Sequence, residues 1–247
     1  MSFSVEGKVA LVTGANRGIG RVIVETLLKN RVAKVYAAVR DSSAIADWVS
    51  QSGGAIVPLT VDLTKPETIQ QAAQKAGDVE LLVNNAGIAK VVSVLAPHAI
   101  ETLQEEMEVN TYGLIRIAQA FAPILAANGG GAIVQINSVV SIRNFANVAT
   151  YSASKAASYS ITQALREQLK EQKTHVLSVH PGPIATDMAK VAGMYDMADP
   201  PSVVAEGIVK ALANNDFHLF PDKMARNFWN AYEAYARQVI ESDPAAG

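Results

Sequence analysis

The stretch Val9-Ala-Leu-Val-Thr-Gly-Ala-Asn-Arg-Gly-Ile-Gly20 decides the fold of this chain. A short apolar run rich in β-branched residues ends in a glycine-rich turn, and apolar residues at helical spacing (Ile19, Ile23 and Leu27) follow it. Glycine lets the backbone turn tightly and approach a ligand, because no Cβ stands in the way. A helix that begins there offers unpaired N–H groups and a partial positive charge, which suit a pyrophosphate. The turn reads G-x-x-x-G-x-G rather than the commoner G-x-G-x-x-G, and its alternative interpretation is a connection without a ligand.

The composition limits the classes of protein to which this chain can belong. Its 247 residues are 49% hydrophobic and 18% charged, which suits one α/β domain over 1–247 with a full-sized core. The formal net charge of −2 gives no reason to expect nucleic acid or an anionic membrane as partner. No cysteine is present, which excludes disulfides and thiol catalysis, and the four histidines show no metal-ligand spacing, so we predict no metal site.

The start of the chain runs straight into the first predicted strand. It lacks the apolar core of a signal peptide, and no apolar run approaches the roughly 18 residues of a membrane span. We therefore expect a soluble, cytoplasmic protein.

Strand and helix patterns alternate from end to end. Strands are predicted over 9–13, 34–39, 56–61, 79–83, 132–136, 176–179 and 217–220, and helices over 19–29, 44–51, 66–75, 97–126, 151–170, 203–213 and 222–241. Continuous apolar strands separated by helices favour a parallel sheet that is covered on both faces. The predicted fold is thus one Rossmann-type, doubly wound parallel sheet of about seven strands.

Polar residues or glycines follow each predicted strand. In parallel sheets of this kind, ligands bind beyond the carboxyl ends of the strands, near the point where the strand order reverses. The residues at these ends are 14–20, Arg40, Asp62, 84–87, Ser138 and 181–182. A purely structural scaffold would not need polar groups at all of these ends.

The segment Tyr151-Ser-Ala-Ser-Lys155 places a phenol and an ammonium group one helical turn apart. A nearby cation favours the phenolate, so we expect the pKa of Tyr151 to be lowered toward neutrality, as suits an acid/base group. Ser138, at a predicted strand end, could hold a carbonyl or hydroxyl oxygen in the same place. The alternative is an exposed pair without function.

Taken together, these motifs resemble the classical short-chain dehydrogenase/reductase family over residues 7–186. The residues that carry the resemblance are Thr13-Gly-Ala-Asn-Arg-Gly-Ile-Gly20, Asn84-Asn-Ala-Gly87, Asn110, Ser138, Tyr151-x-x-x-Lys155 and Pro181-Gly182.

The resemblance implies four catalytic residues. Tyr151 would give a proton to a carbonyl or take one from an alcohol, and Lys155 would lower its pKa and hold the nicotinamide ribose. Ser138 would hydrogen-bond the substrate oxygen as charge develops on it. Asn110 would lie at a break in the long helix and carry a water that links Lys155 to solvent.

The resemblance also implies a nicotinamide dinucleotide site. Residues 85–87 would line the ribose and nicotinamide, Asp62 and Leu63 the adenine, and Ile184 and Thr186 the carboxamide. The full predicted set is Gly14, Asn16, Arg17, Gly18, Ile19, Arg40, Asp62, Leu63, Asn85, Ala86, Gly87, Tyr151, Lys155, Pro181, Gly182, Ile184 and Thr186.

The cofactor is predicted to be NADP(H). NAD enzymes usually place a carboxylate at the end of the second strand, where an arginine instead accommodates the 2′-phosphate. Alignment to the family puts Val39 at the acidic position and Arg40 beside it, and Arg17 could reach the same phosphate. Asp41 leaves the alternative open, since a shift of one position would let it bind a ribose hydroxyl and make the enzyme NAD-linked.

The end of the chain departs from the resemblance. Residues 187–201 are predicted to form a substrate loop, whose methionines suit a yielding apolar surface or plain packing. The helix over 222–241 has an apolar stripe formed by Phe228, Tyr232, Tyr235 and Val239. We expect this stripe to pack beside the substrate loop, within a homodimer or homotetramer.

The sequence thus predicts an NADP-dependent carbonyl reductase or alcohol dehydrogenase that acts on a ketone, an aldehyde or a secondary alcohol. A nucleotide-sugar epimerase is less suited, because such relatives are longer, use G-x-x-G-x-x-G and carry a substrate domain. A regulator that binds the dinucleotide without turnover is the alternative from another class, although such proteins commonly lose the tyrosine or lysine that this chain retains.

Overall fold

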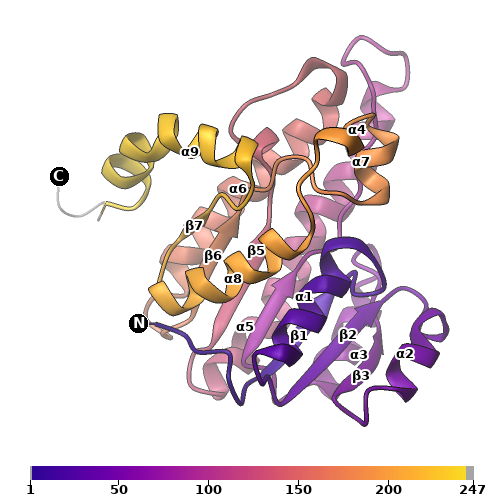
Figure 1. Cartoon of the computed structure of the whole chain (residues 1–247), viewed down its shortest axis with the longest axis vertical. Helices are drawn as coiled ribbons and strands as arrows, with labels where there is room; N and C mark the ends of the chain where they lie inside the picture. Colours follow the sequence, from indigo (N-terminus) through magenta and orange to yellow (C-terminus); the bar gives the residue numbers. More distant parts are fainter. Residues whose placement is uncertain (1, 243–247) are drawn as a thin grey trace.

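The computed structural model describes residues 2–242, and its centre is a sheet of seven parallel strands (Figure 1). The strand order is β3-β2-β1-β4-β5-β6-β7. The strands are β1 (Val9–Thr13), β2 (Lys34–Val39), β3 (Ile56–Thr60), β4 (Leu81–Asn84), β5 (Ala132–Ile136), β6 (His175–Val179) and β7 (His218–Leu219). The order reverses between β1 and β4, which is where a sheet of this kind opens to a ligand.

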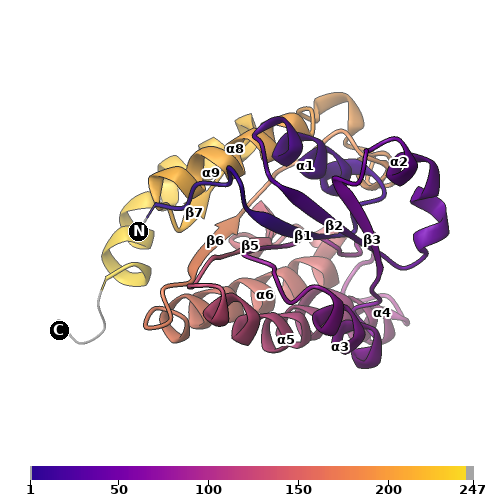
Figure 2. The ribbon, with the colours of Figure 1, turned by 90° about the horizontal axis from the view of Figure 1, so that it is seen from below.

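Two layers of helices cover the sheet, as the predicted doubly wound fold requires. The helices are α1 (Gly18–Lys29), α2 (Ala46–Ser50), α3 (Pro66–Lys75), α4 (Ala99–Met107), α5 (Gly113–Ala127), α6 (Ala149–Gln168), α7 (Asp187–Val191), α8 (Ser202–Asn214) and α9 (Lys223–Tyr235). Figure 2 shows α1, α8 and α9 above the sheet and α3, α5 and α6 below it. Every residue of β4 and β5 is buried, because both faces of the central strands lie under helices.

Each layer of helices packs on the sheet through its own cluster of buried apolar residues. On the first face, Ile23 and Leu27 of α1 pack with Ile208 and Leu212 of α8. On the second face, Ile69 of α3 packs with residues of α5 that include Phe121 and Leu125. Within the described residues, no helix combines the length and the apolar character that a membrane span requires.

Several elements differ from their predicted bounds. The helix predicted over 97–126 is interrupted by a π-helical segment, Glu108–Tyr112, between α4 and α5. The helix predicted over 44–51 begins as a 3-10 turn, Ser42–Ile45, because Asp41 accepts a hydrogen bond from the backbone of Ser43 and so caps a tighter turn. The predicted edge strand 217–220 is confirmed at the edge of the sheet but is only two residues long.

The inner half of the apolar stripe on the carboxyl-terminal helix is covered by segments that the sequence did not indicate. Phe228 and Tyr232 of α9 pack in a cluster with Val139 and Phe220, and this cluster lies beside the segment that follows β5. Tyr235 remains 55% exposed. The start of α9 does contact the predicted substrate loop, since Lys223 N donates a hydrogen bond of 2.9 Å to Asp199 Oδ2. The packing of the stripe itself against that loop remains a prediction.

Candidate active site

The glycine-rich turn after β1 lies directly against the end of β4. Gly14 and Gly18 adopt φ angles of +64° and +53°, which L side chains rarely adopt. A Cβ on Gly14 would lie 3.1 Å from the Cα of Ala86, and a Cβ on Gly20 would meet the Gly14 carbonyl oxygen and lie 2.6 Å from Asn85 Nδ2. Glycine is therefore required here by contact between two strand ends.

Side chains join these two strand ends. Thr13 Oγ1 accepts hydrogen bonds from the backbone N–H groups of Asn85 (2.9 Å) and Ala86 (3.0 Å) and donates one to Asn84 Oδ1 (3.1 Å). Asn85 Nδ2 donates in turn to the Thr13 carbonyl oxygen (2.9 Å). The predicted residues Gly14, Asn85 and Ala86 thus lie in contact where β1 and β4 end.

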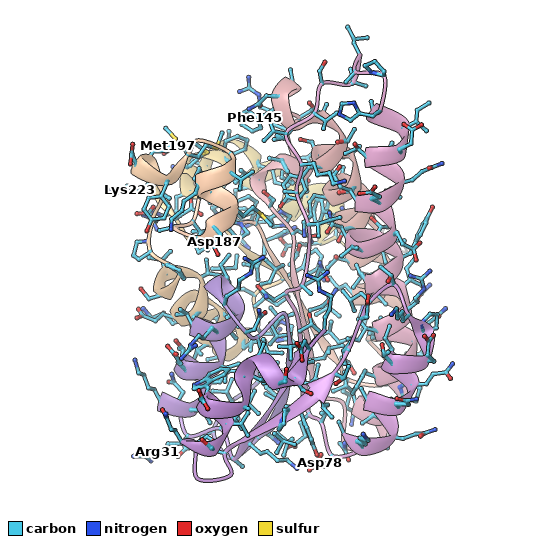
Figure 3. The ribbon with its side chains drawn as sticks, turned by 90° about the vertical axis from the view of Figure 1, so that its right-hand side faces the viewer. Arg31, Asp78, Phe145, Asp187, Met197 and Lys223 are labelled. Atoms are coloured by element: carbon cyan, nitrogen blue, oxygen red, sulfur yellow. The ribbon has the colours of Figure 1, made fainter. Side chains whose placement is uncertain are left out.

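The segment after β6 approaches the same turn from the other side. A Cβ on Gly18 would lie 3.2 Å from Thr186 Cγ2, and Arg17 forms an ion pair of 3.1 Å with Asp187 at the start of α7. Figure 3 shows Met197 in the same part of the molecule as Phe145, with Asp187 nearer the middle and Arg31 and Asp78 at the opposite end. The predicted cofactor residue Thr186 is therefore next to the glycine turn.

Asn110 lies in the π-helical segment, so the predicted break in the long helix is confirmed. Its Oδ1 accepts a hydrogen bond from Ile88 N, and its Nδ2 donates to Ile88 O and to Ser154 Oγ, each at 2.9 Å. A Cβ on Gly87 would lie 3.0 Å from Asn110 Oδ1 and 3.5 Å from Lys155 Nζ. Gly87, Asn110 and Lys155 are therefore neighbours, and π-helical turns of this kind are frequent at functional sites.

Lys155 is buried in α6 and its ammonium group points toward β5. Its Nζ donates a hydrogen bond of 2.8 Å to the carbonyl oxygen of Ile136, the last residue of β5. Burial lowers the pKa of Lys155 to about 8, because the charged form loses hydration. The Nζ atom lies 5.9 Å from the centre of the Tyr151 ring, which keeps the predicted pair together.

The pKa of Tyr151 moves opposite to the sequence-based expectation. Burial raises it to about 12, and this outweighs the hydrogen-bonding effect of Ser138, which lowers it. The charge of Glu106 raises it further. The prediction that the pKa of Tyr151 is lowered toward neutrality is therefore wrong for this arrangement, since desolvation of the phenolate is the largest effect.

Ser138 follows β5 and is 8% exposed. It caps a 3-10 turn, Val139–Ser141, by accepting a hydrogen bond from Val140 N (3.3 Å), and its hydroxyl donates to Pro181 O (3.2 Å). The ends of β5 and β6 are thereby linked beside Tyr151. His180 is fully buried, and its Nδ1 lies 3.0 Å from Ser141 Oγ.

Two carboxyl groups, that of Asp41 after β2 and that of Asp62 after β3, accept hydrogen bonds within local turns. Asp41 Oδ1 accepts hydrogen bonds from Ser43 N (2.9 Å) and Ser43 Oγ (2.6 Å), and these bonds lower its pKa. Burial opposes ionisation of Asp62, but hydrogen bonds from Thr64 and the charges of Lys65 and Arg40 lower its pKa overall. Arg40 is exposed directly after β2, and its guanidinium group is therefore accessible to a ligand in this region.

The remaining predicted cofactor residues differ in exposure. Leu63 and Ile184 are buried, and a Cβ on Gly113 would lie 2.8 Å from Leu63 Cβ. Asn16 is exposed and Ile19 is half-buried. Gly182 N donates a hydrogen bond of 2.7 Å to Asp222 Oδ2, and Pro181 is buried.

A nicotinamide dinucleotide fits these residues. The turn has no side chain at Gly14 or Gly18, so its backbone is open to close approach; the α1 N-terminus follows it, and Arg17 and Arg40 are exposed near it. Among the residues that the structure describes, no group of three or more acidic or histidine side chains is placed to hold a metal ion.

One residue of the site was missed by sequence reasoning. Glu106 is completely buried in α4 and acts on Tyr151 through its charge. The signal was its spacing, since Thr102, Glu106 and Asn110 recur every four residues on the buried face of the helix.

Comparison with known proteins identifies the family. The family described as short chain dehydrogenase matches residues 8–194. The 3-oxoacyl-[acyl-carrier-protein] reductase FabG of Vibrio cholerae is 36% identical over 192 residues, which cover 76% of this chain and 78% of that protein. L-xylulose reductase of Cavia porcellus is 35% identical over 201 residues, which cover 81% and 80%.

A solved structure agrees with this assignment. The crystal structure of a short chain dehydrogenase from Burkholderia cenocepacia in complex with NADP is 34% identical, has a TM-score of 0.87, and covers 96% of this chain and 99% of that one. This chain therefore belongs to the short chain dehydrogenase family.

Proposed function

We propose that this protein is an NADP(H)-dependent carbonyl reductase or alcohol dehydrogenase in which Tyr151 exchanges the proton. The observation that carries the proposal is the meeting of Tyr151, Ser138, Lys155 and Asn110 beside the glycine turn. Two relatives are named as reductases, of 3-oxoacyl-[acyl-carrier-protein] and of L-xylulose, which supports a carbonyl substrate.

The raised pKa of Tyr151 suits a proton donor. With a pKa of about 12 the phenol stays protonated at neutral pH, and it can still protonate the more basic alkoxide that forms as a carbonyl is reduced. Ser138 lies beside the phenol and can donate a hydrogen bond to the same substrate oxygen. Lys155, held on Ile136, supplies positive charge behind them.

The cofactor would be held by the glycine turn and the arginines beside it. The bound nicotinamide supplies or accepts the hydride. Arg40 would contact the 2′-phosphate, and Arg17 could exchange its exposed partner Asp187 for that phosphate. The carboxylate of Asp41 already caps a turn, which disfavours its use for a ribose hydroxyl and supports NADP(H) over NAD(H).

A substrate screen tests the proposal. Oxidation of NADPH would be followed with the purified protein and a panel of aldehydes, ketones, diketones and 3-oxoacyl thioesters. We expect turnover with at least one carbonyl class and a loss of kcat of about 10²-fold or more in Tyr151→Phe, the usual scale for a general acid, with NADPH affinity little changed. Near-normal turnover of Tyr151→Phe would contradict the assignment, and NADPH binding without turnover on any compound would favour a dinucleotide-sensing regulator.

A further inference from the structure

His180 is a completely buried histidine directly after β6, and it lies against the segment that carries Ser138. It is 0% exposed, and its backbone N–H donates a hydrogen bond of 2.7 Å to Leu219 O at the edge of the sheet. The imidazole stacks on the Phe220 ring with 4.7 Å between ring centres and meets the Tyr159 ring edge-on at 4.7 Å. These aromatic neighbours hold the imidazole in one orientation.

Both ring nitrogens of His180 have polar partners. Nδ1 lies 3.0 Å from Ser141 Oγ and 3.3 Å from the carbonyl oxygen of Ser138. Nε2 lies 2.7 Å from Ser178 Oγ, on β6. One side of the ring thus contacts the turn that contains Ser138, and the other side contacts the strand from which His180 itself comes.

These contacts place the proton of the neutral imidazole. The hydroxyl of Ser141 donates its single proton to the Ser138 carbonyl oxygen, so toward Nδ1 it can only accept. The Ser138 carbonyl oxygen is itself only an acceptor. Nδ1 therefore carries the proton, and Nε2 accepts a hydrogen bond from Ser178 Oγ. Burial, assisted by the charge of His218, lowers the pKa of His180 well below its ordinary value, which keeps the ring neutral.

The peptide group between Ser138 and Val139 is held at both of its polar atoms. Its carbonyl oxygen accepts a hydrogen bond of 3.0 Å from Ser141 N and faces Nδ1 of His180. Its N–H donates a hydrogen bond of 2.9 Å to Pro181 O. Because the orientation of this peptide fixes the direction in which the Ser138 side chain leaves the backbone, His180 and Pro181 together determine where the Ser138 hydroxyl lies.

We propose that His180 is a positioning residue, which holds the Ser138 carbonyl oxygen through its Nδ1–H group and so aims the Ser138 hydroxyl at the substrate oxygen. A displacement of about 1 Å in such a group can cost about two orders of magnitude in rate. The effect falls on kcat, because charge on the substrate oxygen is greatest in the transition state. This inference rests on the proposed function of Ser138.

Two substitutions of His180 separate positioning from packing. The amide nitrogen of asparagine can take the place of Nδ1, whereas the amide of glutamine reaches the place of Nε2. Both remove the imidazole from the Phe220 ring, so both should lower the free energy of unfolding to a similar extent. With NADPH and a carbonyl substrate, His180→Gln should lower kcat about tenfold or more and His180→Asn about threefold at most, with KM and NADPH affinity little changed.

The matched control is His175→Gln, the same substitution at the opposite end of β6, where Nε2 lies 2.8 Å from Asp216 O. This variant should retain the wild-type kcat. Urea unfolding of the three variants shows how far kcat follows stability. If His180→Asn loses as much kcat as His180→Gln, the histidine acts through packing alone and the inference is wrong.

The wild-type protein provides a test that needs no variant. Nitrogen NMR of the histidine rings shows which ring nitrogen carries the proton, and the His180 signals are recognised by their nuclear Overhauser contacts to Phe220 and Tyr159. We expect the Nδ1–H form, which the hydrogen bonds select. An Nε2–H form would overturn the inference, because Nδ1 could then not donate to Ser138.

A further readout is independent of turnover. The amide proton of Val139 belongs to the held peptide, so its exchange with solvent, relative to amides in the middle of β5, reports the loss of that hold. Exchange should be faster in His180→Gln than in His180→Asn. Equal exchange in the two variants overturns the role of His180, whereas absence of turnover with this difference present overturns only the proposed reaction.

Discussion

The Nδ1 atom of His218 lies 2.9 Å from Oε1 of Glu241, and this contact joins the end of the chain to the edge of the sheet. On its other side, His218 Nε2 lies 2.6 Å from the hydroxyl of Tyr159, which is on the same helix as Tyr151 and Lys155. The ring of Tyr159 meets His180 edge-on at 4.7 Å. The carboxyl-terminal segment is thus linked through buried polar groups to the helix that carries the proposed acid.

Tyr159→Phe tests the stabilising value of this link. The variant keeps the ring but leaves the Nε2 atom of the buried His218 without its partner, so the free energy of unfolding should fall by about 1–3 kcal/mol. Urea unfolding measures the loss, and Tyr235→Phe, on an exposed residue of the same region, is the control. Equal stability of the two variants would show that the Tyr159 hydroxyl contributes nothing.

Lys155→Met tests the cost of burying the ammonium group. The folded protein has a Lys155 pKa of about 8 against an ordinary value of 10.5, so the unfolded chain binds more protons between these pH values. The free energy of unfolding of the wild type therefore rises as the pH increases through this window. Methionine removes this dependence, while the unpaired Ile136 carbonyl oxygen costs the same at every pH.

We therefore compare the free energy of unfolding of Lys155→Met with that of the wild type at two pH values. The difference, variant minus wild type, should be more positive at pH 7 than at pH 10 by roughly 2–3 kcal/mol. Urea unfolding at the two pH values measures this difference, with Lys170→Met on an exposed lysine as control. The same offset at both pH values would mean that Lys155 keeps an ordinary pKa in the folded protein.

Arg40→Ala tests the choice of cofactor. Loss of a hydrogen bond between a guanidinium and a phosphate should weaken NADPH binding by roughly 1.5–3 kcal/mol and leave NADH binding nearly unchanged. Titration of both cofactors against the wild type, Arg40→Ala and Asp41→Ala measures these effects. A selective loss of NADH binding in Asp41→Ala would instead support an NAD-linked enzyme.

The order of strands and helices was predictable because each buried strand is an unbroken apolar run. The strand-end residues Gly14, Asn85 and Ser138 were also predictable, since parallel strands bring their carboxyl ends to one edge, whereas Thr186 was expected only from the family resemblance. The break at Asn110 was expected from the family resemblance. In the structure it is a π-helical segment, and Asn110 is hydrogen-bonded to Ile88 and to Ser154 of α6.

Other properties depend on neighbours that the sequence does not place together. The spacing of Tyr151 and Lys155 suggested a lowered phenol pKa, but it carries no information on burial, which has the larger effect. The sequence left Asp41 open as a ribose ligand, and it carries no information on the turn that the Asp41 carboxylate caps. The partners of α9 come from distant segments, so its apolar stripe indicated a buried face without naming the covering surface, and only Phe228 and Tyr232 of the stripe are partly covered.

The position of Phe228 supports a revised prediction for the carboxyl-terminal helix. Its ring centre lies 6.4 Å from that of Phe145, in the segment between Ser138 and Tyr151, and the neighbouring Val139 belongs to the same apolar cluster. Phe228→Ala should lower the free energy of unfolding by about 1–3 kcal/mol, less than for a completely buried phenylalanine. It should also lower kcat several-fold, because the segment that orients Ser138 loses its support.

Steady-state kinetics, NADPH titration and urea unfolding of Phe228→Ala would be compared with Tyr235→Ala, which removes an exposed ring from the outer face of the same helix. NADPH affinity should be unchanged in both variants, because neither ring belongs to the predicted cofactor-binding residues. An unchanged kcat together with reduced stability in Phe228→Ala would restrict α9 to a stabilising role. A larger effect on kcat in Tyr235→Ala would instead place the functional contact on the outer face of α9.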